Sequence, residues 1–240
     1  PGPAVEYLAG RPVEETPLPF VAVPTSIGTG SEATMVSVLH DRRAGVVRPI
    51  RDPKMIPPVA VLDPALLAGL PPRLLRLGAV DALAHALESY VSLGATAFTR
   101  AHSWEGSRLL GEALRDLAAG GTDEAAGPGL LLGSYFAGAG LQAGPGLAHV
   151  LAQPITAVTG IPHNAAIASV LPHTVGLNEA RLPGHPAWRA LAGLLEPGGE
   201  GSLTGALRRL LPAAGAAATL RELGALPAQR VLVRDGNAER

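Results

Sequence analysis

The chain has 240 residues, of which 47% are hydrophobic and 16% charged, and its formal net charge is -1. This near-neutral balance gives no electrostatic case for binding nucleic acid or an anionic membrane, and 3% aromatic residues make base stacking unlikely to dominate. Cysteine is absent, which excludes disulfides and thiolate metal sites. The start "PGPAVEYLAG" has no signal-peptide pattern and no apolar run is long enough to cross a bilayer, so we expect a cytoplasmic protein.

The sequence pattern of residues 1 to about 64 is typical of short strands and turns. Residues 1–20 are rich in Pro and Gly and show no period. Apolar runs at residues 20–23, 36–39 and 59–62 predict short strands. A glycine loop over residues 24–30 follows the first run, and a turn is expected near residues 41–45.

From Ala65 onward the pattern becomes helical. We predict helices over residues 65–70, 72–77, 79–93, 97–118, 130–151, 165–171, 188–195, 203–213 and 217–224. The stretches "GGTDEAAGPG" and "EPGGEGS" are predicted as loops, too short to link independent domains. The expected fold class is therefore mostly α, with a β-containing segment over residues 1–64 and an all-helical domain over residues 65–240.

The stretch "GAVDALAHALESY" is almost entirely small and apolar, yet it carries three ionisable residues. Asp81, His85 and Glu88 stand at i, i+4 and i+7, which places them within roughly 60° of one another on one helix face. A helix that is apolar nearly all round is usually interior, and interior charge needs a partner or a metal ion. On this stretch alone, a polar edge that meets water is the favoured interpretation.

A second run, "GLAHVLAQPITAVTGIPHNAAIASVLPH", adds two histidines. His149 stands near the end of an apolar helix that Pro154 is expected to stop, and His163 opens the next helix after Pro162. A lone histidine on an apolar face is more often a hydrogen-bonded core residue than a ligand. Together with Asp81 and His85, however, the set offers the imidazole and carboxylate ligands that suit Fe(II), Zn(II), Ni(II) or Mn(II).

Four motifs now appear in order: "PTSIGTGSE", "VAVLDPALLAGLPP", "GAVDALAHALESY" and "GLAHVLAQPITAVTGIPHN". Together they closely resemble the iron-containing (group III) alcohol dehydrogenases, whose fold is shared with dehydroquinate synthase and glycerol dehydrogenase. The resemblance covers most of residues 18–178. It implies a hydride-transferring oxidoreductase that uses NAD or NADP and a divalent metal ion, Fe2+ or Zn2+. By the same resemblance the metal ligands are Asp81, His85, His149 and His163. Glu88 lies on the same stripe, where it is either a group that supports the metal site by hydrogen bonding or a solvated edge, and the edge is slightly favoured.

The resemblance also assigns a cofactor-contacting group at the front of the chain. These residues match the family's Thr-Thr-x-Gly-Thr-Gly-Ser run and a lysine near the cofactor: Thr25, Ser26, Gly28, Thr29, Gly30, Ser31 and Lys54. Glycines allow close backbone approach, and hydroxyls and amides can face phosphate and ribose oxygens. Taken without the resemblance, the loop reads as an ordinary strand-to-helix turn, and Lys54 as a surface residue.

The chain departs from the family pattern in two places. Only 24 residues precede Thr25, and none forms the Gly-Gly-Gly-Ser pyrophosphate turn, so we expect residues 1–64 to be a remnant of the α/β dinucleotide-binding domain, most of which is missing. Gln153 stands where relatives often carry a second histidine near the substrate. Gln153 is therefore expected to be a substrate contact that cannot accept a proton at neutral pH.

The expected function is the metal-dependent interconversion of an alcohol and an aldehyde or ketone, with the metal ion acting as a Lewis acid on the substrate oxygen. Two alternatives stay open. One is an enzyme resembling maleylacetate reductase, although such relatives typically lack the full ligand set. The other is a truncated, non-catalytic metal-binding helical domain. The small-molecule substrate cannot be read from the sequence, no nucleic-acid or membrane partner is expected, and a homodimer is left open.

Overall fold

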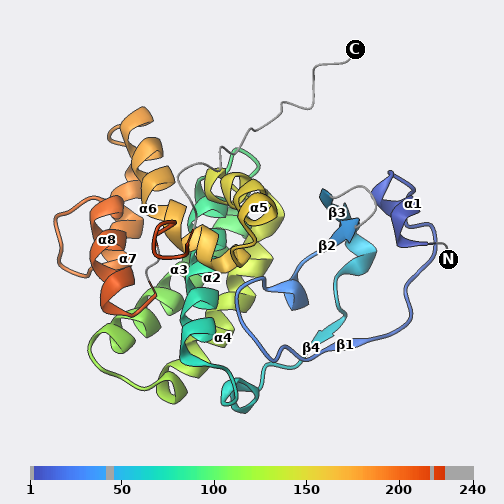
Figure 1. Ribbon diagram of the computed structural model, residues 1–240, viewed down its shortest axis with the longest axis horizontal. Helices are drawn as coiled ribbons and strands as arrows, with labels where there is room; N and C mark the ends of the chain where they lie inside the picture. Colours follow the sequence, from blue (N-terminus) through green and yellow to red (C-terminus); the bar gives the residue numbers. More distant parts are fainter. Residues whose placement is uncertain (1–2, 42–45, 217–218, 225–240) are drawn as a thin grey trace.

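The structure is a computed structural model that describes residues 3–41, 46–216 and 219–224. The helices are α1 (Ala4–Leu8), α2 (Pro72–Val91), α3 (Ala97–Ala118), α4 (Asp123–Gly140), α5 (Leu147–Thr159), α6 (His163–Arg181), α7 (Pro186–Leu195) and α8 (Leu203–Ala213). Short 3-10 turns occupy Ser31–Ala33, Pro53–Met55, Pro64–Leu67 and Leu141–Ala143. Helices α2 to α8 form one body, and α1 and the strands lie to one side of it (Figure 1). The expected mostly-α class is confirmed.

The strands form two small two-stranded sheets. β1 (Val21–Ala22) pairs in parallel with β4 (Val59–Ala60), and β2 (Val36–Asp41) pairs antiparallel with β3 (Val46–Arg51), Val36 lying opposite Arg51. Three of these strands fall where apolar runs predict them, and β3 was not predicted. Of the turn expected over residues 41–45, all but residue 41 lies outside the described residues.

Helix α2 is the centre of the helical body. It packs against α3, α4, α5 and α6, and every residue from 77 to 89 is buried. Small and apolar residues on all sides let four neighbours approach it, as expected for a helix without a polar face. Each polar group on this helix must therefore find a partner inside the protein.

The two helices predicted over residues 72–77 and 79–93 are one continuous helix. Gly78, which lies between the two predicted ranges, does not interrupt the helix and instead permits a close approach. A Cβ atom on Gly78 would lie 2.6 Å from the carbonyl oxygen of Ile27. The glycine loop that leads to the first 3-10 turn therefore lies directly on α2 at this position.

The region from 120 to 159 also differs from the prediction. The stretch "GGTDEAAGPG" is not a loop throughout, because Thr122 accepts a hydrogen bond from the Ala125 N–H and caps α4. The predicted helix over residues 130–151 is two helices, since the chain leaves the helical path between Gly140 and Leu147. Three glycines and a proline within residues 140–146 disfavour helix there.

Proline does not end α5 or α6 as predicted. α5 continues through Pro154 to Thr159, and α6 continues through Pro172 to Arg181. Pro154 removes one backbone donor, but Val150, four residues earlier, is 57% exposed, so water can replace that donor. The predicted helix over 217–224 is wrong for its described part, since residues 220–224 form turns; residues 217–218 lie outside the description.

Within the described ranges no helix combines the length and apolarity that a membrane crossing requires.

Candidate metal site

A buried carboxylate and two buried imidazoles meet between α2 and α5. Asp81 and His85 come from adjacent turns of α2, and His149 comes from the first turns of α5. Each offers one ligand atom, and these atoms all lie within 4.8 Å of one another. We call these three residues the Asp–His cluster. The sequence spacing of Asp81 and His85 thus does place both on one face, as predicted.

The hydrogen bonds of His149 decide what its second ring nitrogen can do. Its Nδ1 lies 2.6 Å from Oε2 of Glu88, and because a carboxylate only accepts, Nδ1 carries the proton of this bond. In the neutral ring Nε2 is then a bare acceptor. It faces Oδ1 of Asp81 at 3.4 Å, and neither atom has a hydrogen-bond donor within the described residues. Two buried acceptors facing each other require a cation between them, either a proton or a metal ion.

His85 is held in a matching way. Its Nδ1 donates to the carbonyl oxygen of Gly28 at 3.0 Å, which leaves Nε2 unprotonated in the neutral ring. The rings of His85 and His149 stack with centroids 4.1 Å apart and an angle of 19°. Both imidazoles therefore donate one N–H to a protein acceptor and leave the other nitrogen able to bind a cation. Metal-binding histidines are commonly oriented by such a hydrogen bond from their other ring nitrogen.

His163, the fourth predicted ligand, lies at the rim of the cluster. It is the first residue of α6, and its Nε2 is 3.8 Å from Oδ1 of Asp81. Its side chain is 39% exposed, whereas those of Asp81 and His149 are 5% and 6% exposed. The structure thus brings three of the four predicted ligands close together and places the fourth beside them at the solvent side.

The electrostatics of the cluster reflect its burial and its charges. Burial lowers the pKa of His85 to about 4, with the positive His149 acting in the same direction. Burial would also lower the pKa of His149, but the adjacent carboxylates of Asp81 and Glu88 outweigh it and raise the pKa to about 9. Burial opposes ionisation of Asp81, yet the neighbouring imidazoles hold its pKa down, at about 2.

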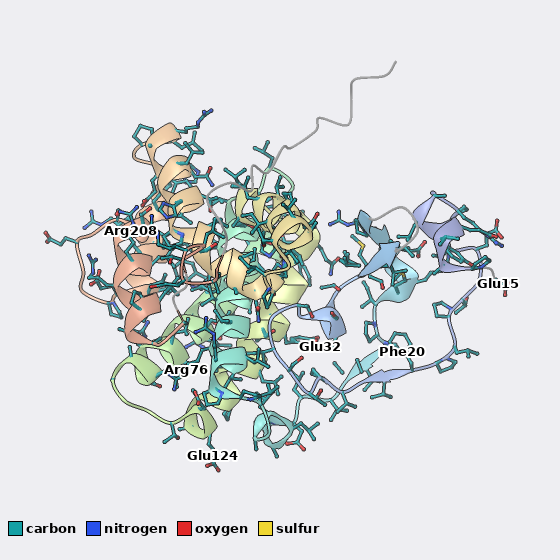
Figure 2. The ribbon with its side chains drawn as sticks, viewed as in Figure 1. Glu15, Phe20, Glu32, Arg76, Glu124 and Arg208 are labelled. Carbon is teal, nitrogen blue, oxygen red and sulfur yellow. The ribbon has the colours of Figure 1, made fainter. Side chains whose placement is uncertain are left out.

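A cavity of about 1010 Å³ opens over the Asp–His cluster. Its polar lining includes Thr29, Ser31 and Glu32 from the glycine loop and the first 3-10 turn, and Gln153 and Thr156 from α5. Figure 2 shows Glu32 on the part of the front segment that faces the helical body, with Phe20, another lining residue, near β1. The cavity therefore lies between the β-containing segment and the helices.

The predicted cofactor group divides into three sets. Thr29 and Ser31 line the cavity, and their hydroxyls are 2.6 Å apart. Gly28 and Gly30 are buried and fix the loop: the Gly28 N–H donates to Ser134 Oγ at 3.0 Å, and Gly30 lies against α4. The others are exposed and are not part of the cavity lining: Thr25, Ser26 and Lys54. The Lys54 ammonium group donates to the carbonyl of Val13 at 2.5 Å.

Glu88 is not the water-facing edge that the sequence favoured. It is 5% exposed and accepts hydrogen bonds from His149, Gly146 and Ala148. These partners are about 60 residues away along the chain, so no local pattern could reveal them. Thr156 and Ala157 were also missed, although helical spacing from His149 and Gln153 would have placed both on the cavity face of α5.

Glu32 provides a prediction about pH. Burial raises its pKa, so its contribution to folding stability is complete below the unfolded value near 4.5 and is lost as the pH rises through the folded value. Glu32→Gln cannot ionise and is expected to gain stability relative to wild type as the pH rises from 4 to 8. Thermal unfolding at several pH values in one buffer series checks this, and a pH-independent difference between the two proteins would contradict it.

Two family profiles match this chain. The profile of the "Fe-containing alcohol dehydrogenase family, C-terminal" matches residues 77–230, and that of "Iron-containing alcohol dehydrogenase" matches residues 3–64. The chain belongs to the iron-containing alcohol dehydrogenase family. The family resemblance expected from the four motifs is thereby confirmed, and the named relatives in this family are alcohol dehydrogenases and reductases.

Three relatives illustrate the match. The "probable alcohol dehydrogenase EutG" of Salmonella typhimurium is 40% identical over 162 residues, which are 67% of this chain and 41% of that protein. A sulfoacetaldehyde reductase of Bifidobacterium kashiwanohense, solved with NAD+, has a TM-score of 0.81 and 26% identity, covering 94% of this chain and 60% of that one. Maleylacetate reductase from a Rhizobium species has a TM-score of 0.75 and 28% identity, with coverages of 85% and 56%. The chain thus spans about half the length of these relatives.

Proposed function

We propose that Asp81, His85, His149 and His163 bind one divalent metal ion, and that the chain is the metal-binding part of an NAD(P)-dependent alcohol–carbonyl oxidoreductase. The observation that carries the proposal is the pair of bare acceptors, Asp81 Oδ1 and His149 Nε2, 3.4 Å apart in a buried site. A carboxylate oxygen with imidazole nitrogens is a donor set that suits Fe2+ and Zn2+ alike.

The chemistry follows from the site. When bound, a divalent ion supplies Lewis acidity toward the oxygen of an alcohol or carbonyl substrate. Asp81 contributes the one negative charge among the four proposed ligands, while Gly28 and Glu88 hold the rings of His85 and His149 by their Nδ1 atoms. His163 stands at the rim, where the cluster meets the cavity.

The same cavity is the proposed place for the nicotinamide end of NAD or NADP and the substrate. Thr29 and Ser31 lie on the loop side of it, and Gln153 on the α5 side is a proposed hydrogen-bond partner of the substrate. Apolar side chains from the front segment and α5 complete the lining, which limits water near a transferring hydride. Cofactor contacts at Thr25, Ser26, Gly28, Gly30 and Lys54, a cytoplasmic location and a homodimer stay predictions.

The test is a metal titration of the purified chain. Apo-protein is dialysed anaerobically against Fe2+ and, in parallel, against Zn2+, and the bound metal is measured by elemental analysis. We expect one ion per chain, bound tightly enough to be retained on desalting. A bound fraction below about 0.1 ion per chain in both dialyses would overturn the proposal.

Two measurements separate the alternatives. An enzyme resembling maleylacetate reductase is favoured if activity persists in full after chelation. A non-catalytic metal-binding domain is favoured if the metal binds to the chain but titration of NADH and of NADPH, followed by their fluorescence, shows no binding. The buried acceptor pair supports a metal site and so argues against the first alternative, and the cofactor titration decides whether the second one holds.

A further inference from the structure

Glu88 makes contacts that the proposed metal site does not use directly. We propose that Glu88 is the positioning residue for His149: its carboxylate fixes the ring so that Nδ1 carries the proton and Nε2 faces Asp81. The inference rests on the proposed metal site and adds a residue that does not touch the metal ion or the substrate. Three hydrogen bonds from one side chain carry it.

The first hydrogen bond fixes the tautomer and orientation of the His149 ring. Glu88 Oε2 accepts from His149 Nδ1 at 2.6 Å, and both side chains are about 5% exposed, so water does not compete for this contact. A buried carboxylate that accepts from Nδ1 selects one of the two neutral tautomers. It also fixes the rotation of the ring, which keeps Nε2 directed at the acceptor atom of Asp81.

The other two hydrogen bonds of Glu88 fix the position of the N-terminus of α5, the helix that carries His149. The N-cap residue of α5 is Gly146, which has no side chain to cap the helix. Glu88 does so from α2 instead: Oε2 accepts from the Gly146 N–H at 2.9 Å, and Oε1 accepts from the Ala148 N–H. A negative charge at this end of a helix is also favourable. One carboxylate therefore anchors both the start of α5 and the ligand one residue beyond Ala148.

Gly146 shows how closely the two helices approach. A Cβ atom at this position would lie 2.8 Å from both Cδ and Oε1 of Glu88. The φ of Gly146 is -108°, which any residue adopts, so alanine here is opposed by Glu88 rather than by the backbone. Gly146→Ala is therefore a way to displace the carboxylate without removing its charge.

The test compares zinc affinities of full chains that lose one carboxylate. In Glu88→Gln the amide has one acceptor oxygen for three donors, so either the His149 Nδ1–H or the Ala148 N–H faces an NH2 group. We expect the zinc affinity of Glu88→Gln to fall about 10- to 100-fold, measured by competition with a chelating dye. Gly146→Ala is expected to weaken zinc binding in the same direction.

Glu179 offers a matched control. It lies on α6 and accepts from the first N–H groups of α8, those of Leu203 at 2.8 Å and Thr204 at 3.2 Å. Within the described residues it has no hydrogen bond to a histidine. Glu179→Gln and Glu88→Gln are both expected to lower the unfolding temperature, whereas Glu179→Gln should leave zinc affinity unchanged. A loss of affinity that merely follows loss of a helix cap would appear in both variants.

A second measurement uses the wild-type chain, so it does not depend on whether a variant folds. In the zinc-loaded wild-type chain labelled with 15N-histidine, long-range 1H–15N spectra should show the proton of His149 on Nδ1 and the metal on Nε2. A proton on Nε2 would overturn the inference, as would zinc binding by folded Glu88→Gln within about twofold of wild type. Failure of the wild-type chain to bind zinc would instead overturn the proposed metal site, and this inference with it.

Discussion

Asp81→Asn is expected to bind Zn2+ at least about 100-fold more weakly than the wild-type chain, because loss of a ligand costs at least as much as loss of a residue that supports one. The substitution keeps the shape of the side chain and removes its charge. An NH2 group directed at Nε2 of His149, 3.4 Å away in the wild type, can donate to it and take the place of the cation. The variant should therefore stay folded while its metal affinity collapses.

The control for this substitution is Asp116→Asn. Asp116 is an exposed residue of α3, so removing its charge should leave zinc affinity and stability unchanged. Competition with a chelating dye gives the affinities, and circular dichroism reports the fold. Equal zinc affinity in Asp81→Asn and wild type would contradict the assignment of Asp81 as a ligand.

Gly138→Ala is expected to lower the free energy of unfolding by about 3 kcal/mol, the upper end of what overpacking usually costs. Gly138 on α4 meets Gly30 of the glycine loop backbone to backbone. A Cβ atom on Gly138 would lie 2.4 Å from the carbonyl oxygen of Gly30 and 2.7 Å from its Cα atom. Neither group is a side chain that can rotate away, so the loop must move off the helix.

A glycine elsewhere in a helix separates this effect from helix propensity. Gly193 lies on the exposed side of α7, and a Cβ atom there would meet nothing within 4 Å. Gly193→Ala is therefore expected to raise the free energy of unfolding by about 0.5–1 kcal/mol. Urea unfolding measures both changes. A Gly138→Ala chain as stable as wild type would show that the loop is not held on α4 by this contact.

The sequence predicts best where a signal is local. The helix over residues 97–118 is found at those bounds as α3, and the spacing of Asp81 and His85 places both in one cluster, because helical periodicity decides each of them. Gly78 misleads for a different reason. It looks like a break in the helix, whereas its small size serves a contact with Ile27, a residue far away in the sequence.

Long-range contacts are what the sequence could not supply. In the sequence Glu88 lies at the edge of a polar stripe. Only the packing of α5 against α2 brings its three hydrogen-bond donors to it. Lys54 stands out as the single lysine of the chain, yet only the fold places its ammonium group against Val13. Pro154 predicts the end of a helix, yet α5 continues through it, because buried Ala152 and Ile155 hold the helix against its neighbours on both sides of the proline.

Gly28 connects the glycine loop with the Asp–His cluster. Its carbonyl oxygen fixes the ring of His85, and a Cβ atom on it would lie 3.1 Å from Oδ2 of Asp81. The position of the loop thus determines the orientation of the His85 ring, a proposed metal ligand. A molecule that binds Thr29 and Ser31 and shifts this loop must change the affinity of the cluster for its cation. By thermodynamic reciprocity, the cation changes the affinity of the loop by the same factor.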